Sequence, residues 1–160
     1  IAEMLTKDVT GEFFRVVSAK NQESVRKVPI HPIIKDLISN LKETSSDGFL
    51  ISGLSRGGED GKRNQNIGKK FGYLKTKLGY KGRATVLHSF RHNLSTAMFN
   101  GGAPREVAKS IVGHSSGDNS SHDIYIDSVD DVVAQQAIQK ASYGEGINAL
   151  VEGLVIVVSN

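Results

Sequence analysis

The 160-residue chain contains no cysteine and no tryptophan, and only 6% of its residues are aromatic. The lack of cysteine excludes disulfide bonds, thiolate metal sites and a cysteine nucleophile, and it fits a reducing compartment such as the cytoplasm. No run of 18 apolar residues occurs, so no membrane-spanning helix is expected. The nearest candidate, ALVEGLVIVV at residues 149–158, is short and interrupted by Glu152. No signal peptide is visible.

Two segments of the chain each have few charges of one sign, although the net charge of the whole chain is only +3. Residues 56–91 contain ten Lys or Arg and two Asp or Glu, a balance of +8. Residues 117–160 contain one Lys and seven Asp or Glu, a balance of −6. A concentrated basic block is typical of a protein that binds a polyanion, although a lysine-rich solvated surface would give the same count.

The N-terminal part of the sequence predicts a helix end followed by a β-hairpin. Residues 1–5 have the character of the last turn of a helix. EFFRVVSAK at 12–20 and VRKVPIHP at 25–32 are rich in β-prone residues, and the polar NQES joins them. In the second run Arg26, Val28 and Ile30 alternate with residues of the opposite face.

Apolar periodicity and terminal glycines predict helices through the remainder of the chain. The predicted helical segments are 33–45, 64–80, 87–102, 103–114 and one or two helices within 123–144. The Gly-rich stretch 53–64 is predicted to be a loop, and residues 147–158 fit either helix or strand. The expected class is mainly α with a small antiparallel β-sheet. A doubly wound parallel sheet is not expected, because strands do not alternate with helices.

The segment LHSFRHN places His88 and Arg91 on one side of a helix, three residues apart. His88 and His92 have the spacing of zinc ligands, but no Glu lies between them as in a metalloprotease helix, and no metal site is expected. A serine hydrolase would need a nucleophile elbow such as GxSxG, which is absent. His92 is interpreted as a structural or supporting residue, and His31 and His122 as exposed loop residues.

Phosphoryl transfer fits the polar residues of this region better. Arg91 could contact two phosphate oxygens at once and would remain charged. His114 could donate to another oxygen, and Tyr125 could serve as a covalent nucleophile. The pKa of a free tyrosine is about 10, so Tyr125 would need nearby cations or a base.

The ordered run LHSFRHNLSTAMFNGGAPREVAKSIVGHSSGDNSSHDIY resembles the signature of the tyrosine recombinases, also called the phage integrase family. Its components are the HxxR helix with His88 and Arg91, the glycine turn NGGAP, the GH at the end of the next helix with His114, and Tyr125. The interval from His114 to Tyr125 is slightly long for the family. Tyr143 lies too far along the chain to be a comfortable alternative.

The resemblance extends upstream to the predicted hairpin, where the family carries a catalytic lysine in the turn. The matching position is Lys20, and Lys27 in the second strand is the runner-up. The similarity covers about residues 1–133 of a single partial catalytic domain, with 134–160 as a tail that could dock on a neighbouring protomer. The family's first catalytic arginine is expected upstream of Ile1, so the chain is interpreted as part of a longer protein.

The resemblance implies a site-specific recombinase that cuts and rejoins double-stranded DNA without a metal or other cofactor, as a tetramer on DNA, encoded by a phage or other mobile element. Tyr125 would form a 3′-phosphotyrosyl link, with Arg91, His114 and His88 at the phosphate and Lys20 protonating the 5′-oxygen. Two alternatives stay open, namely a DNA-binding module of a decayed integrase and a type IB topoisomerase-like enzyme.

The basic block gives a set of residues that are expected to face DNA. Its first members are Lys62, Arg63, Lys69, Lys70, Lys75 and Lys77. The set is completed by Arg83 and by the lysine of the KGR segment, which is assigned to position 82.

Overall fold

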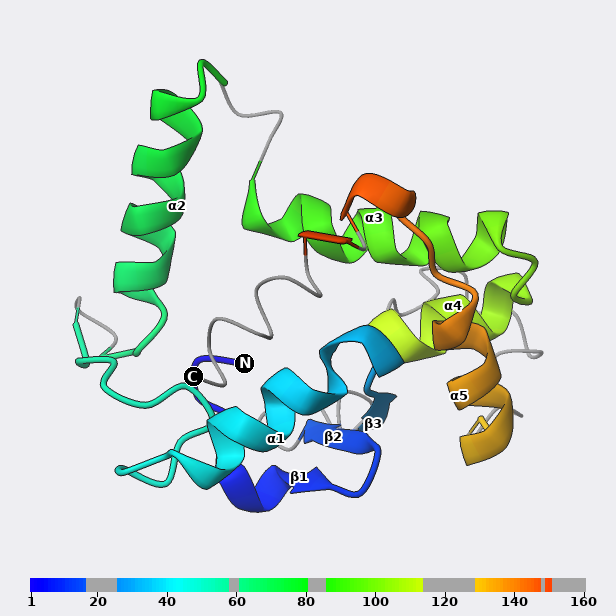
Figure 1. The fold of residues 1–160 in the computed structure, drawn as a ribbon, viewed down its shortest axis with the longest axis horizontal. Coiled ribbons are helices and arrows are strands. Elements are labelled where there is room, and N and C mark those ends of the chain that lie inside the picture. The colour runs from blue at the N-terminus through cyan, green and yellow to red at the C-terminus, as the bar shows by residue number, and fades with distance from the viewer. Residues whose placement is uncertain (17–25, 58–60, 81–85, 114–128, 148, 151–160) are drawn as a thin grey trace, which may run out of the picture.

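The computed structural model describes residues 1–16, 26–57, 61–80, 86–113, 129–147 and 149–150. Within these residues there are five α-helices and one three-stranded antiparallel sheet (Figure 1). The elements are β1 Val9–Thr10, β2 Phe13–Val16, β3 Arg26–Pro29, α1 Lys35–Glu43, α2 Gln65–Lys77, α3 Leu87–Asn100, α4 Arg105–Val112 and α5 Asp131–Gln139. The predicted class, mainly α with a small antiparallel sheet, is confirmed.

The predicted hairpin is formed by β2 and β3. The two strands pair antiparallel, with Phe14 opposite Val28 and Val16 opposite Arg26. Pro29 ends β3, since proline has no N–H to give to a sheet ladder. The connection between the strands, including Lys20, lies outside the described residues.

The prediction of a helix end at residues 1–5 is wrong. This stretch consists of a turn followed by an extended residue, Leu5, which forms an isolated antiparallel bridge with Phe49. A short 3₁₀ helix, Thr6–Asp8, then leads into β1, a strand that the sequence did not predict. The segment is held instead by contacts with distant residues, such as the backbone hydrogen bond from the Leu50 N–H to the Met4 carbonyl.

One hydrophobic core lies between the sheet and α1. It contains the buried side chains Val9, Phe14, Ile30, Ile38 and Leu50, of which Leu50 has no exposed surface. The alternation in the strands explains this placement, because Phe14 on β2 and Val28 on β3 are directly opposite each other and point to the same face. This core therefore fixes the hairpin on α1.

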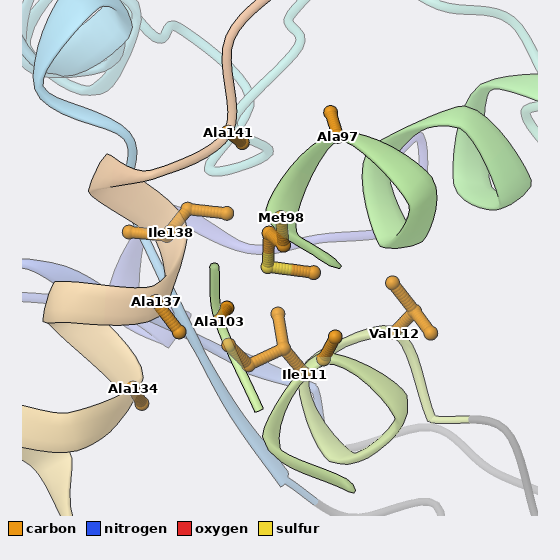
Figure 2. Close-up of a cluster of buried hydrophobic side chains, with 10 residues drawn as sticks. Ala97, Met98, Ala103, Ile111, Val112, Ala134, Ala137, Ile138 and Ala141 are labelled. Atoms are coloured by element: carbon orange, nitrogen blue, oxygen red, sulfur yellow. The ribbon is translucent and has the colours of Figure 1, made fainter. Parts of the chain in front are cut away.

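A second core joins α3, α4 and α5. Met98 is completely buried, and Figure 2 shows it among Ile111 of α4 and Ile138 of α5. The cluster's other members are mostly alanines, which allow the helices to approach closely. At the end of α3, a Cβ on Gly101 would lie 2.1 Å from the Lys140 carbonyl oxygen, so only glycine fits there. Val28 of β3 packs against both cores and links them.

Helix α2 has fewer contacts with the other elements, and Figure 1 shows it at the edge of the molecule. Its Phe71 ring meets Phe90 of α3 edge-on, with the ring centroids 5.8 Å apart. The helix forms where predicted, but Leu74 remains 50% exposed and Leu78 62% exposed. Thus part of the apolar face that the sequence places on α2 is not covered.

None of the helices in the described part of the chain is both long and apolar enough to cross a membrane. Beyond α5, residues 145–147, 149 and 150 are helical, which agrees with the helical interpretation for the start of the 147–158 segment.

Candidate active site and nucleic-acid interface

Helix α3 carries the predicted pair His88 and Arg91 in its first turns. The helix begins after Val86, whose backbone N–H donates to the Ser89 hydroxyl at 3.2 Å. His88 is exposed, whereas Arg91 is half-buried. One face of the helix therefore presents a solvent-accessible imidazole and, one turn later, a guanidinium that enters the protein.

The guanidinium of Arg91 has one nitrogen that is hydrogen-bonded and another that lacks a partner among the described residues. Its Nη2 donates to the carbonyl oxygen of Gly113, the residue that ends α4. Its Nε is buried and has no hydrogen-bond partner among the residues that the structure describes. A buried donor without a partner is costly, and it is satisfied when an anion such as a phosphate binds beside it.

The end of α4 is fixed by its surroundings. Ile111 and Val112 are buried in the second core, and Gly113 adopts a left-handed conformation with φ 69° and ψ 43°. The Gly113 N–H closes the helix on the carbonyls of Lys109 and Ser110. His114 and Tyr125 lie outside the described residues, so their predicted roles remain predictions.

A second arginine, Arg26 of β3, reaches the same helix end. Its Nε donates to the Ile111 carbonyl and its Nη2 to the Val112 carbonyl, each at 3.1 Å. Burial, and secondarily the charge of Arg91, lowers the pKa of the Arg26 guanidinium. The sequence analysis did not single out Arg26. Its place on the same strand face as the apolar Val28 and Ile30 was the available signal.

Lys27, the runner-up for the catalytic lysine, lies on the opposite face of β3. Its Nζ is 2.8 Å from Asp131 Oδ2 at the start of α5, and it stands 5.6 Å from the centre of the Phe13 ring. The side chain is 61% exposed. Lys27 thus connects the sheet to α5 and points away from the helix end that Arg26 contacts.

The basic residues of α2 are displayed on its surface. Lys69, Lys70 and Lys77 are exposed, as is Lys62 just before the helix, and Lys75 is partly covered. Because α2 stands at the edge of the molecule, these charges are accessible to a large ligand (Figure 1).

The expectation of a lysine at position 82 is wrong and is corrected by one position. Residue 82 is Gly82, which has no side chain to contact DNA, and the lysine of the KGR segment is Lys81. The glycine separates Lys81 from Arg83, so the segment still contributes two positive charges to the basic block. All three residues lie outside the described part of the chain, and a DNA contact by Lys81 or Arg83 stays a prediction.

The expectation that Arg63 faces DNA is corrected by its burial. Only 5% of the residue is exposed. Its Nη2 donates to Asp47 Oδ2 at 3.0 Å and to the Ile51 carbonyl at 2.9 Å. The guanidinium lies 3.6 Å above the centre of the Phe49 ring. Arg63 is therefore a structural residue that holds the segment before α2 against residues 47–51.

Asp47 gives the fold a specific dependence on pH. The hydrogen bond from Arg63 is the main reason that the pKa of Asp47 is lowered. Its carboxylate therefore stabilises the fold above the ordinary Asp pKa of about 3.9, and this contribution is lost as the pH falls through the lowered value.

Asp47→Asn is accordingly expected to lose less unfolding free energy than the wild type when urea denaturation is repeated from about pH 5 down to pH 2. Asp36→Asn, which removes an exposed carboxylate in α1, controls for the change in net charge. Equal losses for Asp47→Asn and wild type across this pH range would contradict the assignment.

Two other histidines are described. His92 is exposed beside Arg91 on α3, and its supporting role stays a prediction. His31 is not the exposed loop residue that the sequence suggested. It is half-buried, and its Nδ1 accepts from the Ile33 N–H at 3.2 Å to begin the 3₁₀ helix Pro32–Ile34. Burial lowers the pKa of His31, favouring the neutral ring that this hydrogen bond requires.

The fold is that of a small α+β domain in which Arg26 and Arg91 both donate to carbonyls at the C-terminal end of α4. A model of the phage integrase family matches residues 1–131, and the chain belongs to that family, the tyrosine recombinases. No curated protein and no solved structure matches the chain significantly. Membership connects the chain with DNA integration and recombination, and with the DNA binding that is general in this family.

Proposed function

We propose that the chain is the catalytic part of a recombinase that breaks and rejoins double-stranded DNA through a 3′-phosphotyrosyl intermediate. The observation that carries the proposal is the guanidinium of Arg91, which is held by Gly113 and has a buried Nε without a partner among the described residues. This arrangement suits a phosphate oxygen as the missing acceptor. Gly113, whose carbonyl accepts the hydrogen bond from Arg91, directly precedes His114 in the sequence.

In the proposed reaction, Tyr125 attacks the scissile phosphorus and the 5′-oxygen leaves with a proton from Lys20. Arg91 neutralises the charge that develops on the non-bridging oxygens, and His114 donates to the same phosphate. His88 supports the phosphate or assists proton transfer with Tyr125. The incoming 5′-hydroxyl of a partner strand then attacks the phosphotyrosyl bond and releases Tyr125. The phosphotyrosyl bond preserves the energy of the broken phosphodiester, so the exchange needs no external energy source.

The basic face of α2 is proposed to contact the DNA backbone. Its exposed lysines would add affinity and salt dependence, with little reading of sequence. The proposed contact residues are Lys62, Lys69, Lys70, Lys75, Lys77, Lys81 and Arg83. The acidic segment 117–160 would face protein, and self-association on DNA as a tetramer is part of the proposal. An origin in a phage or other mobile element and action in the bacterial cytoplasm are also part of the proposal.

Neutralising two α2 lysines should weaken DNA binding in a salt-dependent way. Each phosphate contact that is lost should reduce the slope of log K against log salt by about 1, so Lys69→Ala with Lys70→Ala should reduce it by about 2. Fluorescence anisotropy with several unrelated duplexes over a range of salt concentrations measures this slope. Lys7→Ala, at an exposed lysine of the 3₁₀ helix Thr6–Asp8, controls for the loss of a positive charge, and a slope that the α2 variant leaves unchanged would remove α2 from the interface.

A suicide DNA substrate tests the chemistry. A nick close to the scissile phosphate makes the fragment that carries the free 5′-hydroxyl short, so it diffuses away after cleavage and cannot reverse the reaction. The full-length protein should then accumulate as a covalent adduct on denaturing gels. Tyr125→Phe should abolish the adduct and retain DNA binding, whereas Tyr143→Phe should leave it intact. An adduct that survives Tyr125→Phe would refute the nucleophile. No wild-type adduct, with salt-sensitive binding retained, would favour the non-catalytic DNA-binding alternative.

A further inference from the structure

The C-terminal end of α4 is held by two arginines from different parts of the chain. Arg26 of β3 donates to the carbonyls of Ile111 and Val112, and Arg91 of α3 donates to the next carbonyl, that of Gly113. Three successive carbonyls that a helix would leave without partners are thus bound by two cations. The negative end of the helix dipole favours positive charge at this position.

Contact between Arg26 and Gly113 makes this arrangement tight. A Cβ built on Gly113 would lie 2.5 Å from Arg26 Cζ and 2.6 Å from its Nη1. The backbone of Gly113 is also in the left-handed region, which disfavours any side chain. The guanidinium of Arg26 therefore packs directly against the residue that turns the chain out of α4 toward His114.

We propose that Arg26 is a positioning residue for the phosphate site, one that fixes the last turn of α4 and so holds the guanidinium of Arg91. The inference rests on the proposed strand-transfer function. Arg26 would act through the carbonyls that it binds and not by touching DNA. It also joins β3 to the C-terminal end of α4.

Electrostatics supports the same interpretation. Two guanidinium groups meet at one helix end, and the charge of Arg91 contributes to the lowered pKa of Arg26 after burial. Arginine suits this place because its planar fork presents donors to two carbonyls in a fixed geometry, whereas lysine offers a single ammonium on a flexible stem. A phosphate at Arg91 would offset the repulsion between the two cations.

Single-turnover adduct formation with the suicide substrate measures the positioning effect. Misplacement of a catalytic group by about 1 Å can cost about 100-fold, so Arg26→Ala should slow the rate at saturating DNA by roughly 10- to 100-fold. The Kd for DNA should change little. Arg26→Lys should recover only part of the rate. Arg15→Ala, on the exposed face of the neighbouring strand, should match the wild type. An unchanged rate in Arg26→Ala would overturn the proposal.

A double-mutant comparison separates positioning from an independent role. If Arg26 acts through Arg91, adding Arg26→Ala to Arg91→Ala should slow adduct formation by less than about threefold more. Rate losses that multiply in full, or a weakened DNA Kd with an unchanged rate, would instead make Arg26 an independent contact and overturn the proposal.

A measurement without catalysis distinguishes failure of this inference from failure of the proposed function. In NMR spectra of the full-length protein, Arg26→Lys should shift the Gly113 amide and speed hydrogen exchange of the Arg91 Nε–H, with and without inorganic phosphate. If the wild type forms no adduct, the proposed function fails, and this readout still decides the role of Arg26. Unchanged shifts and exchange would overturn it. If Arg26→Ala does not fold, Arg26→Lys serves in all three experiments.

Discussion

Arg91→Ala is expected to slow formation of the covalent DNA adduct by about 100- to 1,000-fold, the usual cost of losing one preorganised donor to a developing negative charge. The physical reason is the position of the guanidinium. One nitrogen is fixed by the Gly113 carbonyl, and the buried Nε has no hydrogen-bond partner among the described residues, so it is free to donate to a phosphate oxygen. The measurement is the single-turnover rate with saturating suicide substrate, so that a change in DNA affinity does not contribute.

Two variants make this test specific. Arg91→Lys keeps the positive charge but cannot reproduce the fork between Gly113 and a phosphate, so it should recover little of the rate. His92→Ala removes the exposed neighbour on α3 and should have a small effect. If Arg91→Lys were as fast as the wild type, charge alone would suffice and the geometric account of Arg91 would be wrong.

Arg63→Ala is expected to destabilise the fold strongly, with a loss of about 3 kcal/mol in the free energy of unfolding. The substitution removes a buried guanidinium that stacks on Phe49 and hydrogen-bonds Asp47 and the Ile51 carbonyl. It leaves these acceptors to find other partners and opens a cavity. Urea denaturation followed by circular dichroism measures the change.

An arginine in the same segment provides the control. Arg56 is 65% exposed, and its contact with Glu3 is long, at 3.9 Å. Surface ion pairs of this kind contribute about 0–1 kcal/mol, so Arg56→Ala should be nearly neutral. Similar losses for the two variants would mean that the burial of Arg63 does not determine its contribution. Normal stability in Arg63→Ala, with weakened DNA binding, would restore its sequence-based assignment to the DNA interface.

The helices and the hairpin were predictable because their signals are local. Apolar spacing and terminal glycines located α3 and α4, with Gly101 and Gly113 at their ends. Alternation within two β-prone runs joined by a polar segment located the hairpin. The HxxR pair followed from the position of His88 and Arg91 on one predicted helix.

The roles of Arg63 and Arg26 were not predictable in the same way, because contacts with residues far along the chain determine them. Arg63 resembles any other charge of the basic block, and only the fold brings it to Asp47, sixteen residues away. Arg26 binds carbonyls 85 and 86 residues further along the chain. Strand alternation could place Arg26 on the inward face, but it could not say which helix end it would meet.

The most direct test of the central claim is identification of the residue that becomes joined to DNA. The full-length protein is trapped on a suicide substrate, digested with nuclease and protease, and the nucleotide-modified peptide is sequenced by mass spectrometry. The account predicts a phosphodiester on Tyr125, attached to the 3′ end of the cleaved strand. A modification at Tyr143, at a serine or at the 5′ end of the strand would contradict it.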